Sequence, residues 1–379
     1  MKSSPVKGLP RGFQANGVAA GIKRSGRPDL ALFYSQAPAK VAAVFTSNSI
    51  KAAPLKVSQS YLSRNEYFQA LIVNSGNANC FTGNAGLADA RKMSLLAARG
   101  LGIRKEAVLV ASTGIIARRM PLGKIENAIP LLVEGLSAKG IGMAGKAIMT
   151  TDTFAKKAHA RVKVGKQSVT IYGVAKGAGM IGPKVATMLC FLFTDANIAR
   201  GALDKALKAA ADNSFNCITV DGCMSTNDMV TLFANGLAKN TAIESGRNFR
   251  SFSRALSSVC LELARMLVRD AEGATKFITV KVSGARSASE ARRAALAVAN
   301  SNLFKTAMFA SSPNVLGRIV AAVGASGAKV KEEKLNISLG DLKGKEVKVE
   351  LSLGCGRQEA VVYTSDLTYK YIKINAGYN

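Results

Sequence analysis

Lys176-Gly-Ala-Gly-Met-Ile-Gly-Pro-Lys-Val-Ala-Thr-Met-Leu-Cys-Phe191 lies in the middle of the chain and joins a glycine-rich loop directly to an apolar strand. Glycine adopts backbone conformations that are closed to other residues and lets the chain approach a ligand closely. Thr187 stands at the junction. A threonine hydroxyl is a weak nucleophile unless a base activates it, and an N-terminal threonine can use its own α-amine as that base. These residues alone leave two interpretations open: Thr187 opens a buried strand, or it becomes a chain terminus after cleavage between Ala186 and Thr187.

The segments on both sides of this stretch alternate between strand-like and helix-like patterns. Short apolar runs bounded by turn residues predict strands, and apolar residues spaced three or four apart predict helices. Before Thr187 we expect strands at residues 41–46, 70–73, 107–111 and 169–174, and helices at 85–99 and 125–136. After it we expect strands at 188–193, 218–220, 229–234 and 276–282, and helices at 202–211 and 252–268. This alternation predicts an α/β or α+β layered protein.

The C-terminal part has a different pattern. Ser287-x-x-Glu290 is a capping box and predicts the start of a helix. Short alternating segments follow at residues 335–339, 347–351 and 360–363, and their turns contain Gly and Asp. We expect these segments to form an antiparallel meander in a smaller C-terminal α+β region.

Length and composition bound the class of protein. The chain has 379 residues and is 48% hydrophobic, which gives room for two or three domains and predicts a globular rather than a disordered protein. The stretch from Met1 to Pro10 lacks the apolar core of a secretory signal, and no apolar run is long enough to cross a bilayer. We therefore expect a cytoplasmic protein without a membrane partner.

The cysteines and the single histidine argue against a metal site. Six cysteines stand at positions 80, 190, 217, 223, 260 and 355, and none forms a Cys-x-x-Cys pair. Cys190 and Cys260 lie in apolar surroundings and are expected to be buried thiols. His159 stands in a basic stretch, residues 156–161, that is expected to be exposed. A Walker A sequence is absent, and Gly177-x-Gly179 lacks the third glycine of a dinucleotide fingerprint. The sequence predicts neither a metal nor an organic cofactor.

The formal net charge of +28 is high, with 52 Lys and Arg against 24 Asp and Glu. Such a charge favours nucleic acid or acidic small molecules as partners. The basic residues are dispersed, aromatic residues make up 6% and tryptophan is absent, which argues against a base-stacking surface. A solvated basic surface is the favoured interpretation, and a nucleic-acid-binding protein stays as the non-enzyme alternative.

Polar clusters interrupt the apolar strands, and functional residues concentrate in such loops. A backbone N–H at Gly114 beside the hydroxyl of Thr113 could stabilise a developing oxyanion. Glu272, between a helix and a strand, could hold a substrate ammonium group. Each cluster alone also fits an ordinary turn, and the acid spacing of one of them fails the EF-hand pattern. The clusters are residues 74–79, 112–114, 149–153, 221–228, 270–276 and 312–318.

In their order along the chain these motifs resemble one family, the glutamate N-acetyltransferases or ornithine acetyltransferases of cyclic arginine biosynthesis. The matches cover nearly the full length. They include Gly17-Val-Ala-Ala-Gly-Ile-Lys, Gly26-Arg-Pro-Asp-Leu-Ala-Leu, Val73-Asn-Ser-Gly-Asn-Ala-Asn-Cys-Phe-Thr-Gly83, Ser112-Thr-Gly-Ile-Ile, Met149-Thr-Thr-Asp-Thr, Lys176-Gly-Ala-Gly-Met-Ile, Ala186-Thr-Met-Leu, Ser225-Thr-Asn-Asp, Glu272-Gly-Ala-Thr-Lys-Phe and Asp366-Leu-Thr-Tyr. The resemblance implies the layered α/β fold of the ornithine acetyltransferases.

The resemblance also implies a site. Thr187 would be the nucleophile, with its α-amine as base after cleavage behind Ala186. Thr113 and Gly114 would form the oxyanion hole. The positions that match substrate contacts of the family are Thr153, Lys176, Thr187, Glu272 and Asn375.

The implied reaction is ping-pong transfer of an acetyl group from N-acetylornithine to glutamate, without metal or organic cofactor, and acetyl-CoA as a second donor is left open. Cleavage would give an α chain of residues 1–186, which carries the oxyanion residues, and a β chain of residues 187–379. The β chain would complete the body to about residue 280 and add a C-terminal domain from about 281 to 379. The two chains would pair into an α2β2 heterotetramer. An N-terminal-nucleophile aminopeptidase or amidase, which passes the acyl group to water, is the rival enzyme.

The chain departs from the family pattern at three places. Cys223 and Met224 replace Asp and Thr in the cluster 221–228. In the cluster 312–318, Ser312 replaces Asp and Val315-Leu316 stands where the family has Trp. The Ser or Thr that the family commonly has about five residues beyond Asn375 is missing from this sequence. These changes leave the nucleophile and oxyanion positions intact and bear on substrate affinity and stability.

Overall fold

The computed structural model describes residues 8–182 and 188–377, which form two compact units. The larger unit consists of the described parts of Met1–Gly177, Thr187–Ser214 and Ser225–Leu263, and the smaller unit of those of Ala178–Ala186, Phe215–Met224 and Ala264–Asn379. The glycine-rich loop and the strand after Thr187 therefore belong to different units. The expectation of an α/β layered fold is confirmed.

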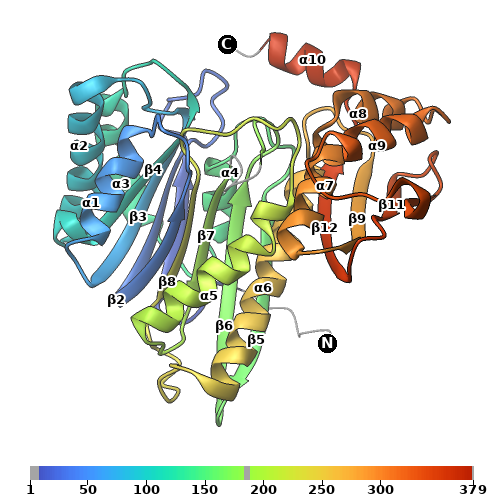
Figure 1. Cartoon of the computed structure of the whole chain (residues 1–379). Helices are drawn as coiled ribbons and strands as arrows, with labels where there is room; N and C mark the ends of the chain where they lie inside the picture. The colour runs from blue at the N-terminus through green and yellow to red at the C-terminus, as the bar shows by residue number, and fades with distance from the viewer. Residues whose placement is uncertain (1–7, 183–187, 378–379) are drawn as a thin grey trace. The chain divides into compact units, whose positions relative to one another are not determined.

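Among the described residues of the larger unit, eight strands form a mixed sheet with the order β4-β3-β2-β8-β7-β6-β5, and β1 pairs with β2 (Figure 1). The strands are β1 (Phe13–Val18), β2 (Leu30–Phe45), β3 (Tyr67–Asn77), β4 (Val108–Ile115), β5 (Lys156–Val164), β6 (Gln167–Lys176), β7 (Leu189–Thr194) and β8 (Met229–Ala234). The helices are α1 (Ala53–Leu62), α2 (Gly83–Leu101), α3 (Leu122–Glu134), α4 (Ile141–Ala147), α5 (Arg200–Asp212) and α6 (Gly246–Arg269), whose last turns belong to the smaller unit.

Strand side chains alternate between the two faces of a sheet, and β2, β3 and β4 are apolar on both. On the face that the helices cover, Leu32, Ile72 and Val110 are buried in one cluster with apolar residues of α1, α2 and α3. Phe33 and Val73 face inward, into a second cluster. A strand buried on both faces must be apolar at nearly every position, which is why residues 70–73 and 107–111 stand out in the sequence.

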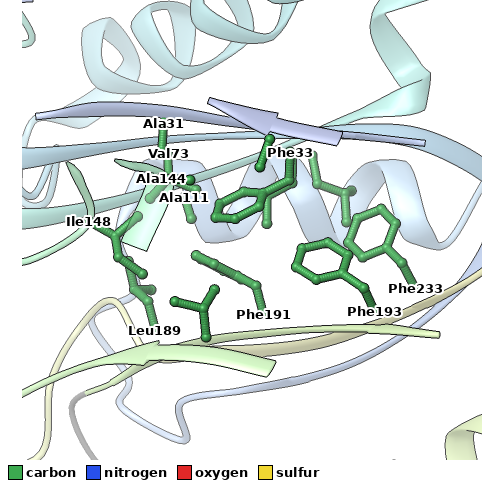
Figure 2. Close-up of a cluster of buried hydrophobic side chains, with 14 of the residues drawn as sticks. Ala31, Phe33, Val73, Ala111, Ala144, Ile148, Leu189, Phe191, Phe193 and Phe233 are labelled. Atoms are coloured by element: carbon green, nitrogen blue, oxygen red, sulfur yellow. The ribbon is translucent and has the colours of Figure 1, made fainter. Parts of the chain in front are cut away.

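The second cluster lies where the sheet folds over on itself. The register of β2 breaks between Tyr34 and Ala39, so that its first half pairs with β3 and its second half with β8. Phe33 then lies 5.5 Å from Phe191 of β7, between ring centroids. Figure 2 shows the side chains from β2, β3 and β4 facing those of β7 and β8, with α4 at one end. This core fixes the ends of β4, β6 and β7.

The smaller unit contains a sheet of the order β10-β11-β9-β12 among its described residues. Its elements are β9 (Phe277–Ala285), α7 (Ala288–Asn300), α8 (Asn302–Phe309), α9 (Val315–Gly324), β10 (Asn336–Leu339), β11 (Glu346–Ser352), β12 (Gln358–Ser365) and α10 (Tyr369–Ala376). Apolar side chains of α7, α8 and α9 pack against the sheet. The predicted helix start is confirmed, because the Ser287 hydroxyl accepts the N–H of Glu290 at the beginning of α7.

Three sequence expectations were wrong. The C-terminal strands do not form a meander, because β9 lies between β11 and β12 and pairs in parallel with β11. Residues 218–220 are not a strand; only Ile218 makes an isolated bridge, to Tyr363. The stretch 156–161 is not an exposed basic segment but part of β5, and Lys156 in it is fully buried.

The expectation of buried thiols is confirmed. Cys190 on β7 and Cys260 on α6 are both fully buried, and burial raises the pKa of each thiol. Neither thiol is therefore a nucleophile near neutral pH. The apolar residues that follow the candidate nucleophile belong to the buried strand β7, so their role is structural.

Candidate functional site

The predicted nucleophile and cleavage position, Thr187 and Ala186, lie outside the described residues. The structure describes the chain up to Gly182 and again from Met188. The groups around these two ends can be placed, each within its own unit.

Thr113 and Gly114 lie at the end of β4, in parallel register with Ser75 and Gly76 of β3. Gly114 has φ +132°, a backbone conformation that favours glycine, and a Cβ built there would lie 2.4 Å from the carbonyl carbon of Gly76. Both the backbone conformation and the close packing therefore require glycine at position 114. A backbone N–H held this firmly is suited to donate to a developing oxyanion.

Lys176 is the last residue of β6 and contacts Thr113. Both residues had been predicted from the sequence as site residues. Lys176 is 4% exposed as a residue, and its ammonium donates to Thr113 Oγ1 at 3.1 Å. Because the threonine oxygen accepts from Lys176, its own hydrogen is free to point elsewhere as a donor. A cation behind the hydroxyl also makes that donor stronger.

Asp152, which was not predicted as a functional residue, organises this end of the sheet. Asp152 Oδ1 accepts from Lys156 Nζ at 2.7 Å and from the N–H of Gly177 at 2.7 Å, and Oδ2 accepts from the N–H of Thr150 at 3.0 Å. Burial disfavours the charged carboxylate, but Lys156 and Lys176 outweigh it and hold the pKa of Asp152 below its ordinary value. The spacing of Asp152 and Lys156, four residues apart, was the signal available in the sequence.

Thr153 follows Asp152 directly and is exposed. The cluster 149–153 therefore divides its roles: the carboxylate points into the protein and the neighbouring hydroxyl-bearing residue faces solvent. The expected substrate contact at Thr153 stays a prediction.

Asp228 contacts Met188, the residue that directly follows the candidate nucleophile Thr187. Its Oδ1 accepts the N–H of Met188 at 3.0 Å, and the residue is 1% exposed. Burial raises the pKa of Asp228 well above its ordinary value, although the Met188 N–H, the charge of Lys176 and the hydroxyls of Ser225 and Thr46 favour the charged form. Burial thus shifts the equilibrium of this carboxyl group toward its neutral form, and its Oδ1 still serves as an acceptor.

The neighbouring Asn227 ties the same segment to the oxyanion strand. Its amide donates to the carbonyls of Ala78 at 2.7 Å and Ser112 at 2.8 Å. Ser112 immediately precedes Thr113, so residues 227 and 228 connect the start of β7 to the end of β4. The sequence showed Asp228 within an acidic cluster but gave no sign that it would reach Met188.

The asparagine-rich cluster at residues 74–79 supports this end of the sheet. Asn74, Asn77 and Asn79 are buried. Asn74 accepts from the Ser112 hydroxyl at 2.5 Å, and Asn77 donates to the carbonyls of Arg118 and Arg119. These amides bond to the protein itself, which favours a structural role for the cluster.

In the smaller unit the structure brings together Glu272 and Asn375. Asn375 Nδ2, on α10, donates to Glu272 Oε2 at 2.8 Å. A Cβ built on Gly179 would lie 2.3 Å from that same Glu272 oxygen, so a side chain at position 179 would displace the carboxylate. The N–H of Glu272 in turn donates to the carbonyl of Ala178 at 2.9 Å.

Asp221 and Tyr371 hold these parts of the smaller unit in place, and no motif in the sequence pointed to Tyr371. Asp221 accepts the N–H groups of Met180 at 2.6 Å and Ile181 at 2.9 Å, and the Tyr371 hydroxyl donates to it at 3.1 Å. Burial and the Asp221 carboxylate raise the pKa of Tyr371. Tyr371 lies one helical turn before Asn375, so this bond orients the face of α10 that carries the amide.

The departures from the family pattern occupy separate places in the smaller unit. Cys223 is exposed and its N–H donates to Asp221 Oδ1 at 3.1 Å. Ser312 accepts the N–H of Asn314 before α9, where Val315 is buried and Leu316 is 47% exposed.

Within the part of the chain that the structure describes, no three His, Cys, Asp or Glu side chains are grouped so that they could hold a metal ion. Across the same residues, no helix has the length and apolar character needed to cross a membrane.

Comparison with known proteins gives a consistent result. A family model described as the ArgJ family matches residues 14–344. The "Arginine biosynthesis bifunctional protein ArgJ" of Geobacter sulfurreducens is 45% identical and covers 97% of this chain and 99% of its own. The protein of the same name from Symbiobacterium thermophilum is 45% identical, with 97% of each chain covered. A crystal structure of an ArgJ protein from Bacillus halodurans is 40% identical and covers 47% of this chain and 92% of that one, with a TM-score of 0.44.

Proposed function

The chain belongs to the ArgJ family of arginine biosynthesis, and on that premise we propose that it transfers an acetyl group from N-acetylornithine to glutamate through an acyl-enzyme on Thr187. The resemblance identified in the sequence is thereby confirmed, and the chain is an acetyltransferase of this family. The observation that carries the proposed chemistry is the contact of Lys176 with Thr113, beside a Gly114 that no other residue could replace.

The first half-reaction forms the acyl-enzyme. The Thr187 oxygen attacks the acetyl carbon of N-acetylornithine while the α-amine of Thr187 takes the hydroxyl proton. The Gly114 N–H and the Thr113 hydroxyl donate to the negative oxygen of the tetrahedral intermediate. The carbon–nitrogen bond then breaks, the proton passes to the departing amine, and ornithine leaves.

The second half-reaction reverses these steps with a new amine. The amino group of glutamate attacks the acetyl ester, the bond to the Thr187 oxygen breaks, and the proton returns to that oxygen. Thr153, Lys176, Glu272 and Asn375 are the residues proposed to hold the amino-acid substrates. Glu272 is suited to an ammonium group because a carboxylate is a charged acceptor with more than one acceptor site, and the Asn375 amide positions it by a hydrogen bond to Oε2.

The same chemistry generates the nucleophile. The Thr187 hydroxyl attacks the carbonyl of Ala186 and the peptide C–N bond breaks, so that the acyl group moves to the Thr187 oxygen as an ester and the α-amine of Thr187 is released. Water then hydrolyses the ester, which frees the Thr187 hydroxyl and leaves Ala186 with a C-terminal carboxylate. Two chains of 186 and 193 residues result. Their assembly into an α2β2 tetramer in the cytoplasm, and the use of acetyl-CoA as a second donor, belong to this proposal.

Denaturing electrophoresis with N-terminal sequencing tests the cleavage. The wild type should give two bands, one beginning Thr-Met-Leu-Cys, and Thr187→Ala should stay as one chain and lose at least about a thousandfold in turnover. Thr187→Ser is the matched control, because it retains both the hydroxyl and the future α-amine. A single intact band from fully active protein would refute the self-processing mechanism.

The rival hydrolase uses the same nucleophile but passes the acetyl group to water. Incubation with N-acetylornithine, with and without glutamate, separates the two functions. Ornithine release that depends on glutamate, with N-acetylglutamate formed in equal amount, supports the transferase. Ornithine release at the same rate in both incubations would favour the hydrolase.

A further inference from the structure

A single oxygen of Asp221 accepts hydrogen bonds from two segments of the smaller unit that are distant in the sequence. Asp221 Oδ2 accepts the N–H of Met180, in the glycine-rich loop, at 2.6 Å and the hydroxyl of Tyr371, on α10, at 3.1 Å. The other oxygen, Oδ1, accepts the N–H groups of Ile181 at 2.9 Å and of Cys223 at 3.1 Å. The carboxylate bonds to protein groups, which favours a role in positioning over contact with a substrate.

The conformation of Met180 shows what Asp221 does to the loop. Met180 has φ +55°, in the left-handed region that residues other than glycine rarely adopt. Such a strained backbone persists only where the surrounding structure fixes it. Met180 is 43% exposed, so packing of its side chain does not explain the conformation, whereas the bonds of Asp221 to its N–H and to that of Ile181 do.

The loop that is fixed in this way forms the surface on which Glu272 rests. The N–H of Glu272 donates to the carbonyl of Ala178 at 2.9 Å. A Cβ built on Gly179 would lie 2.3 Å from Glu272 Oε2 and 2.7 Å from Oε1, so both carboxylate oxygens lie over the bare backbone of that glycine. Because Gly179 stands between Ala178 and Met180, the conformation held at Met180 sets the position of this surface.

The helix α10 reaches the same carboxylate by a second route. Asn375 Nδ2 donates to Glu272 Oε2 at 2.8 Å. None of the residues Tyr369–Ala376 of α10 is buried, so hydrogen bonds carry much of the placement of this helix. One of them is the bond from Tyr371, one helical turn before Asn375, to Asp221. Asp221 therefore fixes the loop directly and α10 through Tyr371.

We propose that Asp221 and Tyr371 are positioning residues for substrate binding, which fix the glycine-rich loop and α10 around Glu272 and so place its carboxylate for an ammonium group of the substrate. N-acetylornithine carries such a group at the end of its side chain. A carboxylate that is already held in place binds more tightly, because binding does not have to order it. This inference rests on the function proposed above, which assigns Glu272 and Asn375 to the substrate.

Tyr371→Phe tests the link to α10, because it removes one hydroxyl and keeps the ring. The KM for N-acetylornithine should rise about three- to tenfold, since a hydrogen bond to a charged acceptor is lost, while kcat should change less than about twofold. Hydrogen exchange of the α10 amides, measured by mass spectrometry without substrate, should become at least about tenfold faster. Tyr369→Phe is the matched control, because it removes a hydroxyl from an 81% exposed residue of the same helix, and it should change neither quantity.

Asp221→Asn tests the link to the loop, because its amide nitrogen cannot accept a hydrogen bond. The KM for N-acetylornithine should rise at least about tenfold, since both the loop and α10 lose a bond. Addition of Met180→Gly to Asp221→Asn should recover at least about threefold of this loss, because glycine adopts the left-handed conformation without strain. A role of Asp221 in stability alone would not be rescued in this way. Circular dichroism reports folding in each variant.

Two results would overturn the assignment. One is a KM in Tyr371→Phe equal to that in Tyr369→Phe, and the other is hydrogen exchange in α10 that does not respond to Tyr371→Phe. If the wild type releases no ornithine from N-acetylornithine, the proposed function fails instead, and hydrogen exchange still decides whether Tyr371 holds α10.

Discussion

Asp152→Asn should strongly destabilise the larger unit, because Lys156 would lose its carboxylate while it stays buried. Both side chains are fully buried and their charged atoms are 2.7 Å apart. Removal of one partner of a buried ion pair costs about 3–5 kcal/mol, because the remaining charge is left in a medium of low polarity. The Phe154 carbonyl, 3.4 Å from Lys156 Nζ, and the Phe154 ring remain near the ammonium but carry no full negative charge.

The magnitude converts to a measurable shift in melting temperature. For a unit of this size 1 kcal/mol corresponds to about 2–4 °C, so Asp152→Asn should lower Tm by roughly 6–20 °C. Thermal and urea unfolding followed by circular dichroism at pH 7 measure the effect. Glu126→Gln is the matched control, because it breaks the exposed pair with Lys92 at 3.5 Å and should cost less than about 1 kcal/mol.

The dependence on pH provides a second readout. The pKa of Asp152 in the folded protein lies below its ordinary value, so its stabilisation is present above about pH 4 and is lost as pH falls through the folded pKa. The stability difference between wild type and Asp152→Asn should therefore narrow in acid. A variant within about 1 kcal/mol of wild type at pH 7, or a difference that does not change with pH, would refute this account of the pair.

Two further predictions concern groups on either side of the candidate nucleophile. Asp228→Asn should cleave itself and turn over like the wild type, because the asparagine oxygen still accepts the Met188 N–H; a loss of cleavage in electrophoresis would show that the charge is needed. Because the pKa of Asp228 is raised in the folded protein, the contribution of Asp228 to stability is fully present below about pH 4 and is lost as pH rises through the folded pKa; urea unfolding should therefore show Asp228→Asn gaining stability relative to wild type as pH rises. Gly179→Ala should displace Glu272, since the new Cβ would lie 2.3 Å from Oε2, and should raise the KM of N-acetylornithine about tenfold or more; an unchanged KM would argue against Glu272 as a substrate residue.

The sequence predicted the strands best where both faces are buried. Residues 70–73 and 107–111 are apolar at every position because α1–α3 cover one face and the second core cluster covers the other. The order of strands was not predictable in the same way. Nothing in residues 346–365 indicates that β9 inserts between β11 and β12, because pairing depends on which edges meet after the helices pack.

Motifs in the sequence pointed to candidate site residues but not to the residues that each of them contacts. Thr113, Gly114 and Lys176 could be singled out from motifs, but their contact joins residues 63 positions apart. Asp152 and Tyr371 were not predicted, because Asp152 owes its role to burial and Tyr371 to a contact with Asp221, which is distant in the sequence. A short polar pattern cannot report whether a charge is buried, and burial sets the pKa and strength of these groups.

Ordered motifs and local periodicity were enough to predict the family and the layered fold class, and they name Thr187 as the candidate nucleophile. Folding decided which charges are paired, as in the buried contact of Asp152 with Lys156. The physical reason is that hydrophobic patterning acts between neighbours in the chain, whereas the energy of a charge depends on solvent and counter-charges that only the folded protein places around it.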